Sequence, residues 1–302
     1  MIIASSPDFW GMERLTKPRF DLTPMPHILI FGLGYTATRI AAALAAKGWD
    51  IVSTGSTGTV RFDDTASIRL ALAQATHILS SVPPVADGDP VLNAYGDLIR
   101  QSPAQWIGYL SSTGVYGDAG GAWVDEGAPL KGRRGNRTQA DLDWLALGSR
   151  VFRLPGIYGP GRSALERVAE GKAHRIDLPA QVFSRVHVDD IVSGVIAGLD
   201  APPGAYNLSD DYPCSQNRVI EAACDLAGVA WPPLQSLEEA NLSPMALAFY
   251  AENRRVANGK AKRLLGWKPA YPTYVEGLRA VSAITSPAIA SAPPAPASNV
   301  QR

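Results

Sequence analysis

The sequence predicts an α/β fold in which helices cover both faces of a parallel, doubly wound sheet, with a smaller lobe near the C-terminal end. Short apolar runs alternate with helical patterns from residue 27 to about residue 154, as expected for strands joined by crossover helices. In addition, the apolar run His27–Phe31 leads into Gly32-Leu33-Gly34 and then into an Ala-rich helical pattern that ends near Gly48. This order is typical of a strand, a tight turn and a helix that open such a sheet.

Apolar runs and helical spacing place the remaining elements in chain order. The expected strands are His27–Phe31, Asp50–Thr54, Val60–Phe62, His77–Val82, Trp106–Ser111 and Arg150–Leu154. Helices are expected between them at about 35–47, 65–74, 90–101 and 137–147. The later chain predicts a strand at Val182–Val188, a helix at Asp189–Leu199, a short strand at Ala205–Leu208 and an amphipathic helix at Ser215–Ala227. Pro-rich breaks at 202–203, 232–233 and 269–272 interrupt this part of the chain.

Composition excludes several classes of protein. Lys and Arg total 28 and Asp and Glu total 28, so no basic surface for nucleic acid or for an anionic membrane is indicated. Cys214 and Cys224 are the only cysteines and have no neighbouring His cluster, so we expect two buried thiols and no metal site. No apolar run approaches the roughly 18 residues of a membrane span, and we expect a cytoplasmic protein.

The glycine turn predicts a dinucleotide site. Gly32 allows the sharp turn, Gly34 lets the backbone approach a pyrophosphate, and the small Ala37 allows close packing of strand and helix. The phosphates would lie on free N–H groups at the start of the helix, where the helix dipole favours negative charge. The alternative is a glycine-rich turn that binds nothing.

The segment after the second strand bears on the choice between NAD and NADP. NAD-selective enzymes usually place an acid there, whereas this chain has Ser53-Thr54-Gly55-Ser56-Thr57, with Arg61 nearby. Hydroxyl groups and Arg61 suit a 2′-phosphate, so the sequence favours NADP over NAD, although the loop could be merely polar. Asp63 is either a candidate to contact the adenine amino group or an ordinary acid near a helix start. Ser81 and Val82 follow the fourth strand and would pass along the ribose and nicotinamide of the cofactor.

Several later motifs together resemble the extended short-chain dehydrogenases/reductases, the NAD-dependent epimerase/dehydratase family. In chain order they are Leu110-Ser-Ser-Thr-Gly-Val-Tyr-Gly117, Trp123-Val-Asp-Glu126, Arg153-Leu-Pro-Gly-Ile-Tyr-Gly-Pro-Gly161, Arg185-Val-His-Val-Asp-Asp190, Tyr206-Asn-Leu-Ser-Asp210 and Leu264-Leu-Gly-Trp267. The resemblance covers most of residues 25–283. It implies that Ser112 is the catalytic hydroxyl, which bonds the reacting oxygen of a substrate, and that Pro155 and Ile157 lie near the nicotinamide.

The chain departs from this family at the catalytic Tyr-x-x-x-Lys pair. Aligning Ala140-Asp141 with the family's Ala-Glu places Arg133 at the Tyr position and Arg137 at the Lys position. Arg137 can bond a ribose or a phosphate, but an arginine is no general acid near neutral pH. The glycine turn is also one residue shorter than Gly-x-x-Gly-x-x-Gly, so the chain resembles the atypical members of the superfamily.

Other residues near Ser112 could replace the missing tyrosine. Tyr116 and Tyr158 are candidates, but Tyr116 is also a family packing position. Asp125-Glu126 is expected to be a solvated loop or a local ion pair, and His187 a structural link between the lobes.

The predicted site therefore combines these positions. The candidate catalytic residues are Ser112 and Tyr116, and the candidate cofactor-binding residues are Gly32, Leu33, Gly34, Tyr35, Thr36, Thr54, Ser56, Arg61, Asp63, Ser81, Val82, Ser111, Arg137, Pro155 and Ile157.

Domain boundaries follow from the same patterns. We expect a dinucleotide-binding Rossmann core over 25–155, to which 182–208 returns, and a small substrate lobe over 156–181 and 209–283. Met25 lies just before the first strand, so we expect 1–24 to be a disordered tail or an upstream mis-start. The segment 284–302, rich in Ala, Pro and Ser, is expected to be disordered.

Two functions fit these observations. The first is an NAD(P)-dependent oxidoreductase or epimerase that acts on a sugar-like or other small carbonyl or hydroxyl substrate, which could be anionic. The second is a non-catalytic NAD(P)-binding sensor or scaffold. By analogy with relatives, the chain could form a homodimer.

Overall fold

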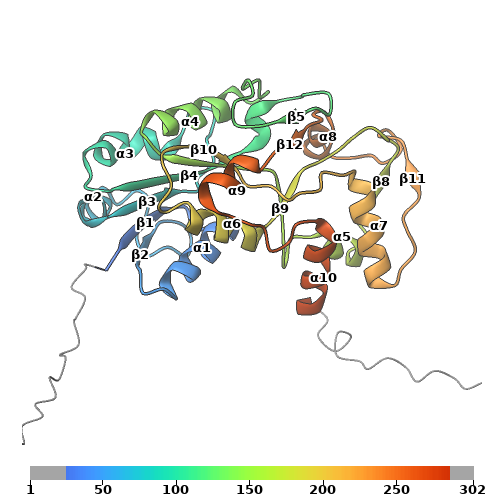
Figure 1. The fold of residues 1–302 in the computed structure, drawn as a ribbon, viewed down its shortest axis with the longest axis horizontal. Coiled ribbons are helices and arrows are strands. Elements are labelled where there is room, and N and C mark those ends of the chain that lie inside the picture. Colours follow the sequence, from blue (N-terminus) through green and yellow to red (C-terminus); the bar gives the residue numbers. More distant parts are fainter. Residues whose placement is uncertain (1–24, 286–302) are drawn as a thin grey trace, which may run out of the picture.

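The computed structural model describes residues 25–285 (Figure 1). The expectations for residues 1–24 and for the tail after residue 285 lie outside the described residues. The helix α10 (Tyr274–Thr285) includes the first two residues of the expected C-terminal tail, so that boundary was placed too early.

The centre of the fold is a parallel six-stranded sheet. Its strands are β1 (His27–Phe31), β2 (Asp50–Ser53), β3 (His77–Ser80), β4 (Trp106–Ser112), β6 (Arg150–Leu154) and β10 (Gly204–Asn207). They lie in the order β10-β6-β4-β3-β1-β2, and every neighbouring pair is parallel. The sheet changes direction of winding between β1 and β3, which is where ligands bind in doubly wound folds.

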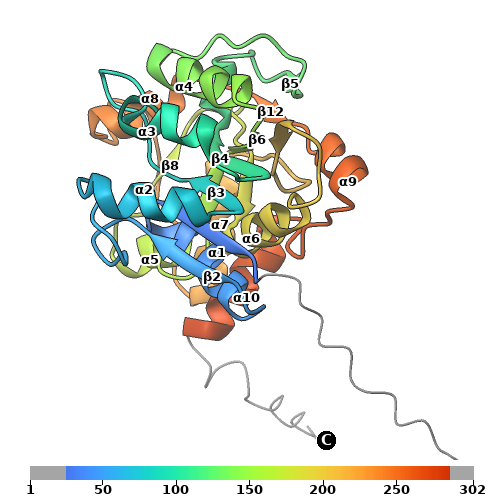
Figure 2. The ribbon, with the colours of Figure 1, turned by 90° about the vertical axis from the view of Figure 1, so that its left-hand side faces the viewer.

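Helices cover both faces of the sheet (Figures 1 and 2). On one face, α1 (Tyr35–Ala45) and α6 (Val188–Ala197) pack on the side chains of Ile28 and Ile30. On the other face, α2 (Thr65–Gln74), α3 (Pro90–Gln101) and α4 (Gly135–Ala146) cover Leu29 and Phe31. Successive residues of β1 thus point to opposite faces, and both faces are apolar because both are buried. The predicted fold class is confirmed.

The expected strand Val60–Phe62 does not form. Val60 makes only an isolated parallel bridge to Thr54, and its N–H donates to the carbonyl of Ser53 (3.1 Å). Gly58 brings the chain back so closely that a Cβ there would lie 2.6 Å from the Ser53 carbonyl oxygen. The segment folds back on the end of β2 as a loop, and too few residues remain for a sheet strand.

A smaller lobe packs beyond the carboxyl ends of the strands. Its core joins α5 (Ala164–Ala169), α7 (Gln216–Ala227) and α10, with Ile220, Ala223 and Leu278 buried among them. Both cysteines lie in this core as free, buried thiols.

Short elements join the core to this lobe. They are η1 (Thr113–Tyr116), β7 (Gly156–Tyr158) paired with β9 (Arg185–His187), β5 (Trp123–Val124) paired with β12 (Arg255–Val256), β8 (Arg175–Ile176) paired with β11 (Leu234–Gln235), α8 (Pro244–Tyr250) and α9 (Gly259–Leu265). The β5–β12 pair brings a segment near residue 255 beside the end of the core sheet.

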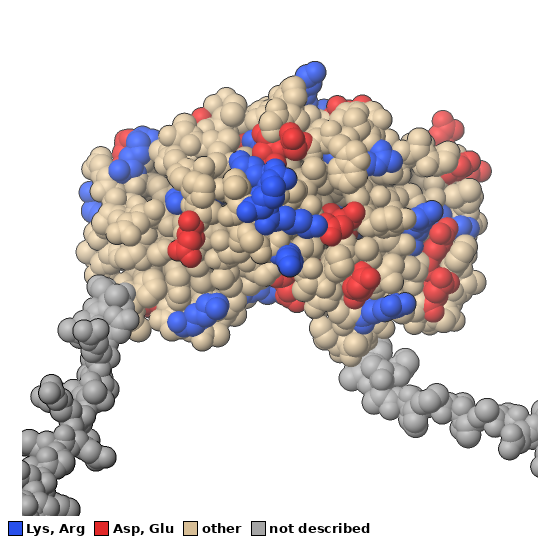
Figure 3. All heavy atoms as spheres, in the orientation of Figure 1, with Lys and Arg blue, Asp and Glu red and all other residues tan. Residues whose placement is uncertain are grey.

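The surface mixes both signs of charge (Figure 3). A small group of basic side chains lies over α9, where Lys262 pairs with Asp211 (2.5 Å) and Lys260 donates to the carbonyl of Ala205 (2.8 Å). These lysines are used within the fold. Within residues 25–285, no helix combines the length and the apolar character needed to cross a bilayer.

Candidate cofactor and substrate site

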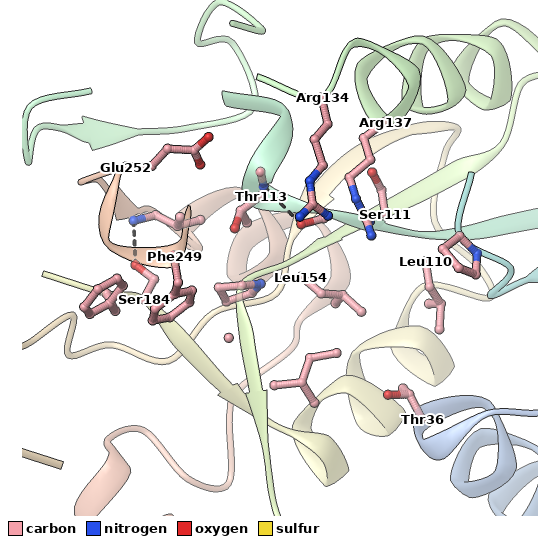
Figure 4. A pocket seen from close by; sticks show the side chains of 18 of the residues that line it. Thr36, Leu110, Ser111, Thr113, Arg134, Arg137, Leu154, Ser184, Phe249 and Glu252 are labelled. Atoms are coloured by element: carbon pink, nitrogen blue, oxygen red, sulfur yellow. Dashed lines mark hydrogen bonds between the residues drawn. The ribbon is translucent and has the colours of Figure 1, made fainter. Parts of the chain in front are cut away.

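A cavity of about 680 Å³ opens at the carboxyl ends of the central strands. One half is lined by the start of α1, by Ser81 and by the end of β4. The other half is lined by the segment that leads into α4 and by two segments from the later chain, 182–184 and 248–256 (Figure 4). The cavity therefore lies between the core and the smaller lobe.

The glycine turn is held by its own neighbours. Gly32 has a φ of +83°, and a Cβ there would lie 2.9 Å from Cγ2 of Val82, so both conformation and space require glycine. The N–H of Gly32 donates to the buried Thr54 hydroxyl (3.0 Å), and the Ser81 hydroxyl donates to the Gly32 carbonyl (2.5 Å). Thr54, Ser81 and Val82 thus shape the turn, and of these three only Ser81 also lines the cavity.

The next residues leave room for a phosphate. A Cβ built on Gly34 would meet no atom within 4 Å, and Gly34 begins the cavity side of the turn. In the described part of the chain, the backbone N–H groups of Tyr35, Thr36 and Ala37 donate to no protein acceptor. Unpaired N–H groups at a helix start, facing a space that is open at a glycine, match the requirements of a pyrophosphate.

Tyr35 closes one side of this half of the cavity. Its hydroxyl donates to the carbonyl of Pro160 (3.1 Å), and the guanidinium groups of Arg39 and Arg162 lie 4.1 and 5.7 Å from its ring centre. Burial raises the pKa of Tyr35, although the two arginines oppose the shift. Tyr35 therefore stays protonated and links α1 to the loop after β7.

The residues predicted to contact the adenosine lie at the surface. Ser56 is exposed, and Arg61 pairs with Asp63 through two hydrogen bonds (3.0 and 2.8 Å) between exposed side chains. None of the three lines the cavity. The segment 53–57 at the end of β2 carries no acid, as the sequence shows.

Ser112 lies at the end of β4 and lines the cavity. Its hydroxyl accepts a hydrogen bond from the N–H of Gly114 (3.1 Å), which leaves its own proton available to a substrate oxygen. Ser111 also lines the cavity, but its hydroxyl donates to the buried Asp141 (2.6 Å). Pro155 and Ile157, predicted to lie near the nicotinamide, line the same cavity.

The structure turns Tyr116 away from the cavity. Its buried hydroxyl donates to Oδ1 of Asn207 (2.7 Å) and accepts from Nη1 of Arg153 (3.0 Å), and burial raises its pKa. Tyr158 is also buried outside the lining, with its hydroxyl 3.5 Å from the carbonyl of Thr273. Neither tyrosine is placed to exchange a proton with a substrate.

The arginines at the positions of the family's Tyr and Lys have different surroundings. Arg137 lines the cavity beside Ser111 (Figure 4). Arg133 instead reaches the later chain, where its Nε donates to Glu252 (2.8 Å). Glu252 also accepts from Arg254 (2.6 Å), and these two hydrogen bonds outweigh burial and hold the pKa of Glu252 below its ordinary value.

The cavity also includes residues that the sequence did not identify: Arg134, Phe183, Ser184, Phe249 and Glu252. Arg134 directly precedes α4 and could have been noticed in the sequence, because it directly follows Arg133 at the position of the family's catalytic tyrosine. The other four come from segments that no local motif marks, and only the tertiary fold brings them to the site.

His187 and Glu126 have structural contacts. Nδ1 of His187 accepts from the N–H of Asp189 (3.2 Å) at the start of α6, and the His187 ring lies against Tyr271 (4.1 Å between centres). Glu126 accepts from the N–H of Asn207 (2.7 Å).

Comparison with known proteins finds relatives of this chain, although no model of a protein family matches it. A conserved protein of unknown function from Silicibacter pomeroyi has a solved structure that is 41% identical, covers 87% of this chain and all of that chain, and superposes with a TM-score of 0.77. A 3-diazoavenalumate denitrifying reductase from Streptomyces is 30% identical over 158 residues, which are 47% of this chain and 51% of the reductase. The match thus spans about half the length of that enzyme.

More distant structures share the fold. A structure of a putative NAD-dependent epimerase/dehydratase from Methylobacillus flagellatus is 22% identical, with a TM-score of 0.68, over 87% of this chain and 99% of that one. Structures of the same fold include MoeE5 with UDP-glucose and NAD (16% identity, TM-score 0.66) and a human epimerase family protein, SDR39U1, with NADPH (14%, 0.67).

Proposed function

Because the chain belongs to one family with the conserved Silicibacter pomeroyi protein and has the fold of the NAD-dependent epimerases/dehydratases, we propose that it is an NAD(P)-dependent oxidoreductase or epimerase. Its substrate would be a sugar-like or other small carbonyl or hydroxyl compound. One observation carries the proposal: the open Gly34 turn with its unpaired N–H groups and the hydroxyl of Ser112 face the same cavity.

The residues of the first half of the cavity suit the cofactor. The N–H groups of Tyr35, Thr36 and Ala37 would hold the pyrophosphate, and Arg137, Pro155 and Ile157 would surround the nicotinamide riboside. The cofactor supplies hydride transfer when bound. The lack of an acid at the end of β2 favours NADP, with Ser56 and Arg61 among the exposed polar side chains that follow β2.

Ser112 is the proposed catalytic residue. Its hydroxyl would donate to the reacting oxygen, because the backbone N–H of Gly114 already occupies its acceptor side. Arginines stand where the family has its Tyr-x-x-x-Lys pair. Arg137 can stabilise a developing oxyanion, but it cannot protonate one at neutral pH. Any proton that the reaction needs would then come from water.

The absence of a proton donor supports a second candidate function. Among the described residues that line the cavity, the only carboxylate is Glu252, held ionised by two arginines, and the only tyrosine is Tyr35, bonded to Pro160. A protein that binds NAD(P) without turnover, as a sensor or scaffold, also fits these contacts. A cytoplasmic location and a homodimer remain predictions.

A fluorescence titration of the purified chain with NADPH and with NADH tests the proposal. We expect saturable binding of both and tighter binding of NADPH. Preference for NADH would overturn the NADP assignment and leave the family function in place. Binding of neither cofactor would overturn both candidate functions.

Turnover then separates the enzyme from the sensor. If the wild-type protein oxidises NADPH with any carbonyl compound of a screen, Ser112→Ala should lower kcat by on the order of 10²-fold and leave the Kd for NADPH unchanged. Unchanged turnover in Ser112→Ala would contradict the role of Ser112. NADPH binding without turnover on any carbonyl would favour the sensor.

A further inference from the structure

The cavity carries an excess of positive charge. Five arginines line the cavity, namely Arg133, Arg134, Arg137, Arg162 and Arg254, against the single carboxylate of Glu252 within the described residues. The pair of Arg133 and Arg254 shares Glu252. This ion-paired group neutralises only part of the charge.

Arg134 and Arg137 are the two arginines beside Ser112 that the fold does not use. Throughout residues 25–285, neither guanidinium has an ion pair or a hydrogen bond with a protein group. Figure 4 shows both side chains extending from the start of α4 towards Thr113 and Ser111, one next to the other. Two adjacent cations at a cavity wall repel each other, so an anion between them would be stabilised by both.

Another wall of the cavity, in the half lined by segments 182–184 and 248–256, is flat and apolar. The rings of Phe183 and Phe249 stack at 4.3 Å with an angle of 7° between their planes, and Tyr250 meets Phe183 edge-on at 5.6 Å. Phe183 is buried, whereas Phe249 is 48% exposed and lines the cavity. A buried ring thus fixes the orientation of an exposed one, as in an aromatic surface that receives a planar ligand.

We propose that this half of the cavity is a binding site for a small, flat organic anion, whose apolar body lies against Phe249 and whose carboxylate or phosphate is held by Arg134. The inference rests on the proposed function, because it names the substrate class of the same site. The ligand is small because one cavity of about 680 Å³ would hold it together with the nicotinamide end of the cofactor.

This placement gives each residue a separate effect. Arg134 recognises charge and Phe249 recognises shape, so the two contributions can be removed one at a time. Arg69 offers a matched control, since it is an exposed arginine on α2 outside the cavity lining.

Ligand-observed NMR titration of the full chain with cinnamate and with its neutral isostere cinnamamide tests the inference, with and without NADP⁺. We expect cinnamate to bind about tenfold more tightly, because a charged hydrogen bond is lost with the amide. Arg134→Gln should abolish this difference, and Arg69→Gln should keep it. Phe249→Ala should weaken both probes equally. Phenyl phosphate, titrated in parallel, shows whether the site prefers a phosphate or a carboxylate.

Three results would overturn the inference: equal binding of cinnamate and cinnamamide, discrimination that survives Arg134→Gln, or UDP-glucose binding more tightly than either small anion. NADPH titration of the same samples keeps this test separate from the proposed function. If the protein binds NADPH but binds cinnamate and cinnamamide equally well, the anion site is refuted and the proposed function is not. If the protein binds cinnamate more tightly than cinnamamide but binds no cofactor, the anion site is supported and the proposed function is refuted.

Discussion

Behind the cavity, a buried polar chain fixes the positions of Ser111 and Tyr116. Asp141 accepts from the Ser111 hydroxyl and from two nitrogens of Arg153 (3.1 and 2.7 Å), and Arg153 also donates to Tyr116. The sequence identified Ser112 and Arg137 through motif position, and both line the cavity. It could not show that Tyr116 points away, because the direction of that side chain depends on Arg153 and Asn207, far away in the sequence.

Removing the charge of Asp141 should strongly destabilise the fold. Asp141→Asn leaves the guanidinium of Arg153 buried without a counter-charge, because Asp141 and Arg153 are 0% and 2% exposed. We expect a loss of about 3–5 kcal/mol in the free energy of unfolding, measured with urea. The control Asp143→Asn, on the partly exposed side of α4, should change it by less than about 0.5 kcal/mol. Equal effects of the two variants would contradict this role of Asp141.

Elements that depend on local sequence were predicted well, and elements that depend on distant pairing were not. The turn at Gly32 and the helices α2 and α3 follow from glycine positions and apolar spacing, and α2 and α3 begin and end where the sequence predicted. The strand at Val60–Phe62 was wrong, because an edge strand needs a partner along its whole length and the close return at Gly58 leaves only a bridge.

Gly34→Ala separates the cofactor role of the turn from its structural role. Gly34 has a φ of −89° and a Cβ there meets no protein atom, so the melting temperature should change little. If a pyrophosphate lies against this residue, the added methyl group should weaken NADPH binding by about tenfold or more in the fluorescence titration. In contrast, Gly32→Ala should destabilise the fold itself, because its Cβ would overlap Val82. Unchanged NADPH affinity in Gly34→Ala would place the pyrophosphate elsewhere.

At the scale of the whole molecule, the cavity is complete only when core and lobe are packed together. Phe183, Phe249 and Glu252 come from chain segments that carry no motif, so the sequence could predict part of the lining near the glycine turn and none of these three residues. The same packing buries acids near the junction. Burial raises the pKa of the Asp210 carboxyl to about 7, against the charge of Arg185 and the backbone N–H groups of Tyr212 and Arg185. Burial likewise raises the pKa of Asp190 to about 6.

These acids should make the protein less stable as the pH rises. An unfolded Asp has a pKa of about 3.9, so between about pH 4 and pH 7 the folded state binds more protons at Asp210 than the unfolded state does. The free energy of unfolding should therefore fall over this range, by on the order of 2–4 kcal/mol, and Asp190 adds to the fall up to about pH 6.

Urea unfolding at about pH 5.5 and pH 8 measures this dependence. Asp210→Asn should remove most of the difference in the free energy of unfolding between the two pH values. Asp87→Asn, at an exposed position, should leave that difference unchanged. A wild-type protein that is more stable at pH 8 would show that Asp210 is ionised in the fold.

The loop that folds back on β2 affects both the choice of cofactor and the tendency of the protein to aggregate. The N–H of Ser53 donates to the Thr59 hydroxyl (3.0 Å), and the Ser53 carbonyl accepts from the N–H of Val60 (3.1 Å), so both outward-facing backbone groups of Ser53, at the end of this outermost strand, are already paired. Free groups at a sheet edge invite another chain to pair and aggregate. An engineer who wishes to switch the coenzyme can therefore change the exposed Ser56 freely. Replacing the whole loop would uncover the N–H and the carbonyl of Ser53 at this edge and should favour aggregation.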